Sequence, residues 1–361
     1  MTGGERIPLI DSHTHCGTEQ EVGVLTGVMD ELKLKACMVC AICYGAGDQT
    51  ISTPLALLLK LSRPGQIYAS GGLFYKLPGQ RKMNLDLPGQ AAKLMSLGFD
   101  GMKMLQGKPT AYREIGIPMN APVYDEYYAF LQAERIPVVF HVADPEEFWD
   151  RTKIPAHFLE MGWCYDDGTY PAKEQLYGEI DDVLDRFPEL RIVFAHFYFL
   201  SADMERAARF LDRRPTVSFD ITPGMEMYGN FSARADQWSD FFTRYKDRLV
   251  FGTDNVCPVD EGSLAMAVEK IRCMRRFLAT RDEFVFDGYK CRGLGLGADV
   301  LESIFHLNFE RYFGARPRDV NVASALAYCK ELAAIANRMD DGAKIASSLE
   351  SIARKISRLA G

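Results

Sequence analysis

The chain has 361 residues, of which 47% are hydrophobic, and a formal net charge of -7 at pH 7. The acidic balance, without clusters of Lys and Arg, argues against nucleic-acid or membrane-surface binding, and no apolar run reaches the roughly 18 residues of a transmembrane helix. The first six residues lack the apolar segment of a secretion signal, and the nine cysteines are odd in number. We therefore expect reduced thiols and a soluble, cytoplasmic protein.

The first strand-like segment, residues 7–13, leads into the polar sequence Asp11-Ser12-His13-Thr14-His15. Two histidines at positions i and i+2 of a strand point to the same face, so their imidazoles can converge on one metal ion. The alternative for each histidine is a core residue that bonds a backbone carbonyl. Asp11 is expected either to orient a metal-binding imidazole or to cap the turn.

The second segment, residues 36–44, carries Cys37, Cys40 and Cys43 with the spacing CxxCxxC. This spacing is found in metal-cluster sites. In a strand, however, it places Cys40 on the face opposite Cys37 and Cys43, so the three thiols could not share one ion. We therefore favour a buried strand over a metal cluster.

Four later apolar segments also end in a residue that can bind or bridge a metal, namely Lys103, His141, His196 and Asp254. A core has little use for polar groups repeated at strand ends, because each buried one needs a partner, and a shared metal would supply it. A cationic lysine beside a metal is unfavourable, so Lys103 is expected to be carboxylated or to bend toward a carboxylate or an anionic substrate. The alternative is a surface lysine in a loop.

The order of the segments indicates the architecture. Eight strand-like runs occupy residues 7–13, 36–44, 66–74, 98–105, 136–142, 191–197, 216–221 and 249–253. Helical periodicity fills most gaps, at 54–61, 87–97, 121–134, 176–187, 202–211 and 238–245. Alternating strands and helices predict an α/β fold with parallel strands, and the closed form is the (β/α)8 TIM barrel, whose chemistry lies at the strand carboxyl ends. An open doubly wound sheet is the alternative.

Two connections, residues 143–175 and 255–298, are too long for plain crossovers and are expected to form lids or pocket walls. The aromatic residues of the first connection either line a pocket for a planar acid or anchor the loop; they are Phe148, Trp149, Trp163 and Tyr165. The glycine-rich sequence 292–297 lacks the Lys-Ser/Thr of a phosphate loop, so we expect a loop that enters a helix over 298–305.

The last 45 or so residues form a different pattern. Apolar side chains recur at steps of three and four over 322–336 and 345–359, and Asp340-Asp341-Gly342 separates the two stretches. The pattern predicts an α-helical hairpin, which divides the chain into a barrel, 1–314, and a C-terminal extension, 315–361. The hairpin either packs on the barrel or forms a helix-helix contact in a homo-oligomer.

Taken together, His13-Thr14-His15 after the first strand, Lys103 after the fourth, His141 after the fifth, His196 after the sixth and Asp254 after the eighth resemble the amidohydrolase superfamily. The resemblance covers most of residues 7–313. The segment 301–314 is similar to the last barrel helix of the amidohydrolase-related (amidohydrolase 2) branch, which contains aminocarboxymuconate semialdehyde decarboxylase. The resemblance implies a metal-dependent TIM-barrel enzyme that acts on a small-molecule substrate.

The resemblance also implies a set of ligands for one or two divalent metal ions, with zinc as the default. His13, His15 and Asp254 would hold the more buried ion, and Asp254 would take a proton from water. In binuclear members a carboxylated lysine, here Lys103, bridges the ions, and His141 and His196 hold the second one. In mononuclear members His141 joins the first ion and His196 acts on the substrate. Both arrangements remain open.

Three functions follow from these expectations. The first is a hydrolase of an amide, ester or lactone, with Asp254 as general base. The second is a non-oxidative decarboxylase or hydratase of a small carboxylic acid. Some members of that branch carry an extra metal-binding Glu just before His-x-His, which Ile10-Asp11-Ser12-His13 lacks. The third is a barrel that binds a ligand or partner without catalysis, and the presence of all six site residues argues against it.

Overall fold

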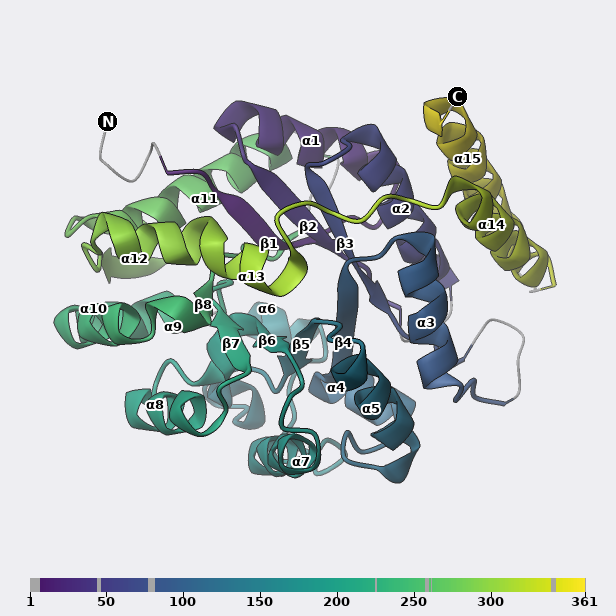
Figure 1. The fold of residues 1–361 in the computed structure, drawn as a ribbon. Coiled ribbons are helices and arrows are strands. Elements are labelled where there is room, and N and C mark those ends of the chain that lie inside the picture. Colours follow the sequence, from purple (N-terminus) through teal and green to yellow (C-terminus); the bar gives the residue numbers. More distant parts are fainter. Residues whose placement is uncertain are drawn as a thin grey trace.

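The centre of the fold is a sheet of nine short strands in which every neighbouring pair is parallel (Figure 1). The computed structural model describes residues 7–43, 47–76, 82–224, 226–256, 260, 262–338 and 342–360. The strands are β1 (Ile10–His15), β2 (Ala36–Cys40), β3 (Ile67–Gly72), β4 (Gly101–Gly107), β5 (Val138–Val142), β6 (Ile192–Phe194), β7 (Val217–Asp220), β8 (Leu249–Val250) and β9 (Asn255–Val256).

Helices surround this sheet, as the alternating sequence pattern predicts. They are α1 (Glu21–Leu32), α2 (Ser52–Ser62), α3 (Leu87–Leu97), α4 (Pro109–Ile115), α5 (Asp125–Ala133), α6 (Ala156–Glu160), α7 (Lys173–Arg186), α8 (Met204–Arg213), α9 (Met227–Ala233), α10 (Ala235–Arg244), α11 (Ser263–Ala279), α12 (Ala298–Glu302), α13 (Asn308–Phe313), α14 (Val322–Ala336) and α15 (Gly342–Ala360). The predicted α/β TIM barrel with a C-terminal helical hairpin is confirmed.

The last strand of the barrel is interrupted. β8 pairs with β7 and β9 pairs with β1, so two short segments of one stretch of chain close the ring. Between them, Ser12 N donates a hydrogen bond to Phe251 O (3.0 Å) and Asp254 N donates one to His13 O (2.8 Å). A strand was expected over 249–253, but β8 ends at Val250, and the backbone turns at Asp254, whose φ is 55°, before β9 begins.

Helix α13 covers the amino-terminal ends of the strands. Phe309 and Phe313 belong to the apolar cluster inside the barrel, and the ring of Phe309 packs edge-on against Tyr68 at 4.8 Å. Tyr312 Oη donates a hydrogen bond to the carbonyl of Thr216, the residue before β7 (2.8 Å). Helix α13 therefore closes the amino-terminal end of the barrel. The polar residues at the carboxyl-terminal ends of the strands lie at the opposite, open end.

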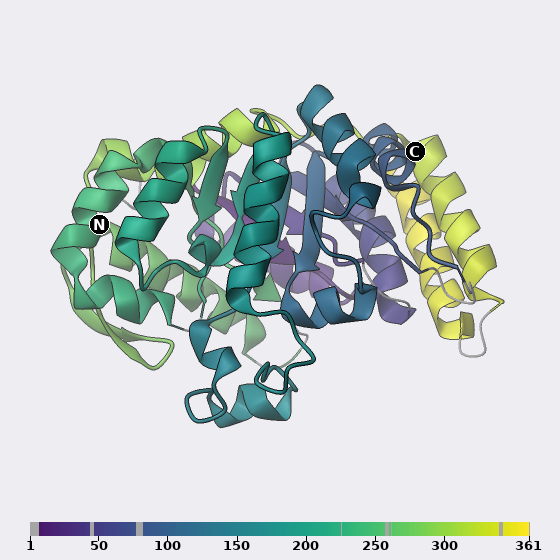
Figure 2. The ribbon, with the colours of Figure 1, turned by 90° about the horizontal axis from the view of Figure 1, so that it is seen from below.

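The long connection after β5 projects from that open end. Figure 2 shows α6 and the neighbouring loops below the barrel, opposite α13. The connection after β9 contains α11 and a two-stranded antiparallel hairpin that the sequence analysis did not predict, β10 (Glu283–Phe286) and β11 (Tyr289–Arg292). The glycine-rich sequence then leads into α12, as expected. Both long connections therefore supply walls of the barrel mouth.

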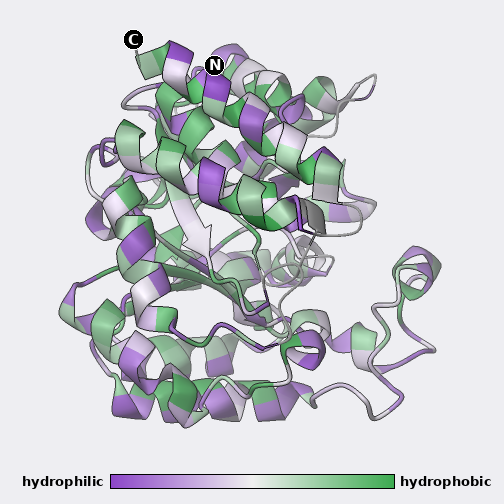
Figure 3. Cartoon of the chain, turned by 90° about the vertical axis from the view of Figure 1, so that its right-hand side faces the viewer, coloured by the Kyte–Doolittle hydropathy of each residue, from purple (hydrophilic) through white to green (hydrophobic). Residues whose placement is uncertain are grey.

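Helices α14 and α15 pack against each other and against α2 beside the barrel (Figure 1). Purple and green alternate along the helices in Figure 3, as expected for helices that bury one stripe. The buried residues of α14 and α15 include Leu332, Leu349 and Ile352. The apolar stripes are thus used within the chain, whereas the division into two domains and the homo-oligomer contact stay predictions.

A buried ion pair joins the barrel to the segment that leads into α14. Lys60 Nζ lies 2.5 Å from Asp100 Oδ2, and both side chains are almost fully buried. The other carboxylate oxygen of Asp100 accepts a hydrogen bond from Arg318 N (2.6 Å). Because a buried charge needs a partner, these contacts fix the start of the C-terminal segment on the barrel.

Several other predictions concern residues at the edges of these elements. Cys37 packs in the outer core and Cys40 in the cluster inside the barrel, which confirms that they lie on opposite faces of β2.

Residues 1–6, Tyr44 and the predicted turn residues Asp340 and Asp341 lie outside the described residues. Within the described chain, the helices are too short or too polar to cross a membrane.

Candidate metal centre

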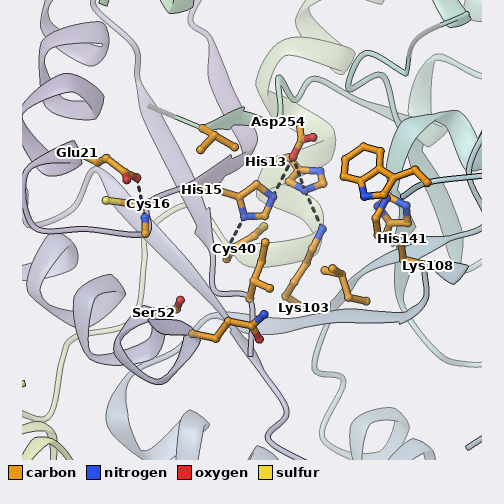
Figure 4. Close-up of a pocket in the computed structure, with 16 residues that line it drawn as sticks. His13, His15, Cys16, Glu21, Cys40, Ser52, Lys103, Lys108, His141 and Asp254 are labelled. Atoms are coloured by element: carbon orange, nitrogen blue, oxygen red, sulfur yellow. Dashed lines mark hydrogen bonds and ion pairs between the residues drawn. The ribbon is translucent and has the colours of Figure 1, made fainter. Parts of the chain in front are cut away.

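His13 and His15 point into the barrel mouth from the end of β1 (Figure 4). Their ring centroids are 5.1 Å apart, in the i, i+2 arrangement that the sequence predicted. His15 Nδ1 donates a hydrogen bond to the backbone carbonyl of Cys40 on β2 (2.8 Å). A carbonyl can only accept, so this bond leaves Nε2 of neutral His15 with a lone pair directed into the mouth.

His13 is oriented by a residue that the sequence analysis missed. Asp220, at the end of β7, accepts a hydrogen bond from His13 Nδ1 (2.9 Å) and is fully buried. This bond places the Nε2 lone pair toward the mouth. Burial, together with the charge of Lys103, lowers the pKa of His13 well below its usual value, so the ring is neutral and able to donate that lone pair.

Asp254 completes the group from the turn between β8 and β9. Its Oδ1 lies 2.9 Å from His15 Nε2 and 3.6 Å from His13 Nε2. Burial by itself would raise the pKa of Asp254, but the contact with His15 and the nearby imidazoles of His13 and His196 outweigh burial and hold that pKa well below its usual range. The carboxylate is therefore ionised at neutral pH.

Asp11 holds the turn that carries Asp254. Its carboxylate accepts hydrogen bonds from Thr253 N (3.0 Å), Thr253 Oγ1 (2.7 Å) and His13 N (3.3 Å). Burial raises the pKa of Asp11 to about 7, although these hydrogen bonds oppose the rise. Of the two roles expected for Asp11, the structure therefore favours support of the turn over a bond to an imidazole.

The group of His13, His15 and Asp254 suits a divalent metal ion. One ligand atom from each residue lies within 4.8 Å of the other two. The lone pair of His15 Nε2 faces a carboxylate oxygen at 2.9 Å, which is unfavourable unless a proton or a cation lies between them. Two imidazoles and a carboxylate suit zinc, manganese, iron or nickel. These donor atoms therefore fit the ion that the sequence analysis predicted.

Lys103 extends from β4 into the same group. Its Nζ donates a hydrogen bond to His13 Nε2 (2.7 Å), and only 2% of the residue is exposed. The ammonium thus lies on the lone pair that would bind the metal, and an ion held there would require Lys103 to move or to be carboxylated. The alternative of a surface lysine is wrong, whereas metal binding by Lys103 stays a prediction.

His196 reaches the mouth through an unusual turn after β6. Four consecutive residues, His196, Phe197, Tyr198 and Phe199, have φ between 50° and 56°, which costs about 1–2 kcal/mol for each residue with a side chain. The turn is held by a hydrogen bond from His196 N to Asp220 Oδ1 (2.8 Å) and by burial of its aromatic rings. Asp220 therefore positions both His13 and His196.

The ring of His196 lies between those of His13 and His141, with centroid distances of 5.8 and 4.8 Å. Its Nδ1 is buried and has no hydrogen-bond partner in the described part of the chain. Burial and the neighbouring His141 lower the pKa of His196 to about 4. A neutral ring with a free nitrogen is available to a substrate or a metal.

His141, at the end of β5, is engaged differently. Its Nε2 donates a hydrogen bond to Asp144 Oδ1 (3.2 Å), and Asp144 also accepts from Lys108 Nζ (3.1 Å to each oxygen) and Tyr165 Oη (2.6 Å). Burial lowers the pKa of His141 to about 4 despite this contact with Asp144. His141 does not join the three converging ligand atoms, and its role as a metal ligand stays a prediction.

The sequence contained a signal for one of the two missed aspartates. Asp220 is the last residue of β7, whereas His141 lies near the end of β5 and His196 follows β6, so the pattern of polar strand ends extends to β7. Asp144 lies in the loop after β5 and has no such signal.

Two chambers meet at this group. The first chamber, of about 460 Å³, is mostly apolar; its lining includes Cys40, Ile42, Leu105 and Val256 (Figure 4). The second chamber, of about 410 Å³, is lined by aromatic side chains, by His196 and by Lys270 of α11. Lys108, His141, Trp163 and Asp254 line both chambers. Trp163 of the long connection therefore lines both chambers. This agrees with the expectation that aromatic residues of this connection line a pocket.

Known proteins resemble this chain in sequence family and in fold. The profile of a family described as "Amidohydrolase" matches residues 90–315. A search of curated proteins gives no match. An uncharacterized TIM-barrel protein from Bordetella bronchiseptica is 13% identical, with a TM-score of 0.53 over 86% of this chain and 99% of that one.

Two solved structures of enzymes with a named activity are also similar to this chain. A 2,6-dihydroxybenzoate decarboxylase is 12% identical, with a TM-score of 0.49 over 85% of this chain and 99% of that one. A dihydroorotase from Saccharomyces cerevisiae is 12% identical, with a TM-score of 0.46 over 85% of this chain and 84% of that one. At such identities structural likeness concerns the barrel fold alone.

Proposed function

Because this chain belongs to the amidohydrolase family, we propose that it is a metal-dependent hydrolase of an amide, ester or lactone in a small organic molecule. The observation that carries the proposal is the convergence of His13, His15 and Asp254 within 4.8 Å at the open end of the barrel. Zinc is the default ion, and a single ion per chain matches the three converging donors. When bound, the ion would supply a Lewis acid that polarises a carbonyl group and lowers the pKa of water.

The roles of the side chains follow from their hydrogen bonds. Asp254 is ionised and directs one oxygen to His15, so its other oxygen is the proton acceptor for an attacking water. His196, which lines the second chamber, would orient the substrate or exchange a proton with it. Lys103 would bind substrate oxygen or, when carboxylated, a second ion.

One observation also favours a second candidate, a metal-dependent non-oxidative decarboxylase or hydratase of a small carboxylic acid. Only three side chains converge among the described residues that could ligate a metal, and His196 is left to act on the substrate. In the mononuclear arrangement that the resemblance implies for this chemistry, His196 acts on the substrate and His141 would join the ion. The identity of the product separates the two candidates.

The first experiment is to measure metal content by elemental mass spectrometry on protein purified without chelator and with bicarbonate. It is followed by a screen of small esters, lactones, amides and carboxylic acids, with CO2 release recorded separately from hydrolysis. Asp254→Asn is expected to lower kcat by about 100-fold or more, because a general base contributes that much. Asp240→Asn, an exposed residue of α10, is the matched control.

Three results would overturn the proposal. Protein that stays free of metal after the ion is added back would exclude a metalloenzyme. Metal-dependent turnover that survives Asp254→Asn would exclude the role of that carboxylate. Release of CO2 without hydrolysis would replace the first candidate by the second.

A further inference from the structure

Among the residues that the structure describes, the second chamber of the mouth contains a cation without a partner. Lys270 of α11 lines this chamber together with His196 and Asp254. The residue is half-buried, and among the described residues nothing forms a hydrogen bond or an ion pair with its ammonium. A cation held partly out of water is unfavourable unless an anion pairs with it.

The other charges around the chamber do not fill this role. Lys108 and Asp144 pair with each other at 3.1 Å, and the carboxylate of Asp254 lies 2.9 Å from His15. Asp287, in the turn between β10 and β11, lines the chamber but is exposed and forms no ion pair with Lys270. Lys270 is therefore the cation that remains for a ligand.

The position of Lys270 relates it to the candidate metal centre. The ammonium-bearing side chain of Lys270 and the side chains of His196 and Asp254 line one and the same chamber. A ligand bound to Lys270 would thus lie beside the reacting groups.

The walls of the chamber define the rest of the ligand. Five aromatic side chains, from the long connection, from the turn after β6 and from β11, form part of these walls: Phe148, Phe158, Trp163, Phe199 and Tyr289. These rings favour a flat, apolar or unsaturated body packed against them.

We propose that Lys270 binds a carboxylate of the substrate, and that the substrate is a small planar carboxylate whose ring or unsaturated body packs between these aromatic walls. The reacting group would then face Asp254 and His196, with the recognised carboxylate at a separate position on the molecule. This assignment rests on the proposed function in placing the reaction at Asp254, but the binding itself can be tested without turnover.

The probes are benzoate and its neutral analogue benzamide, titrated by calorimetry into the full-length, zinc-loaded protein. Lys270→Met is expected to weaken benzoate binding about tenfold, because a charge-assisted hydrogen bond is lost, and to change benzamide binding less than twofold. Lys270→Arg should retain the preference for benzoate. Lys290→Met, an exposed lysine of β11, is the matched control.

Each other outcome would overturn the assignment. Benzoate binding that is unchanged in Lys270→Met would place the carboxylate elsewhere, for example on the metal or on Lys108. Equal weakening of both probes would show that the side chain acts through shape rather than charge. Failure of wild-type protein to bind benzoate would exclude the planar carboxylate. Metal content, measured on the same samples, shows separately whether the proposed function has failed.

Discussion

Two histidines at the barrel mouth occupy equivalent positions and yet differ in what they can bind. His15 donates through Nδ1 to a backbone carbonyl, so Nε2 faces the open mouth next to Asp254. His141 donates through Nε2 to Asp144, which Lys108 and Tyr165 also bond. Each ring therefore keeps free the nitrogen that its hydrogen-bond partner does not use, which is Nε2 in His15 and Nδ1 in His141.

The largest expected effect tests this comparison directly. We expect His15→Ala to lower metal affinity by about 1000-fold, since one of three converging ligands is lost, and His141→Ala to lower it by less than tenfold. Competition with a chromophoric chelator measures both values. Equal losses in the two variants would show that His141 is a ligand and would remove the contrast.

The network around His141 should contribute more to stability than to metal binding. Asp144→Ala leaves the partly buried Lys108 without its partner, and we expect the free energy of unfolding to fall by about 3 kcal/mol. Urea denaturation of wild type and variant measures the difference, with Asp240→Ala as the exposed control. Metal content should stay at the wild-type value. An additional equivalent of metal would mean that Asp144 alone keeps His141 from acting as a ligand.

The neutral state of His196 can be examined through pH. Its pKa is lowered to about 4 in the folded protein, from 6.5 in an unperturbed chain. As pH falls below 6.5, the unfolded chain binds a proton that the folded protein does not, so this residue makes stability fall with pH. Between pH 7 and about pH 5, metal-free wild type should lose about 2 kcal/mol more than His196→Asn.

The measurement is the free energy of unfolding of both proteins at the two pH values. A constant difference between wild type and variant would show that His196 titrates normally and is not buried in its neutral form. Direct titration of the ring by NMR gives an independent value.

The smallest expected effect concerns Asp220, which positions His13 and the turn that carries His196. Asp220→Asn keeps the size of the side chain but weakens its hold on His13 Nδ1, so metal affinity should fall about tenfold. The far-ultraviolet circular dichroism spectrum should not change. An unaltered affinity would mean that His13 is held by packing alone.

Much of this arrangement was predictable from local patterns. Apolar runs that alternate with helical periodicity predicted the eight barrel strands and their order, and polar residues at the ends of those runs predicted most of the candidate site. The exception in the strands was residues 249–253, of which only Leu249 and Val250 form a strand. A turn at Asp254, stabilised by Asp11, separates this strand from β9. The hydrogen bond from Thr253 to Asp11 joins residues that are 242 positions apart. A local sequence pattern cannot predict a contact between residues so far apart.

The sequence by itself determined the barrel and the set of polar groups at its mouth. Short periodic segments of the sequence are enough to specify which strands are buried and in which order strands and helices follow each other. The tertiary structure alone decided which ring nitrogen of each histidine stays free. Asp220 holds His13 across 207 residues, and Asp144 holds His141 across three. A hydrogen bond depends on distance and direction in space, and the separation of two residues along the chain defines neither.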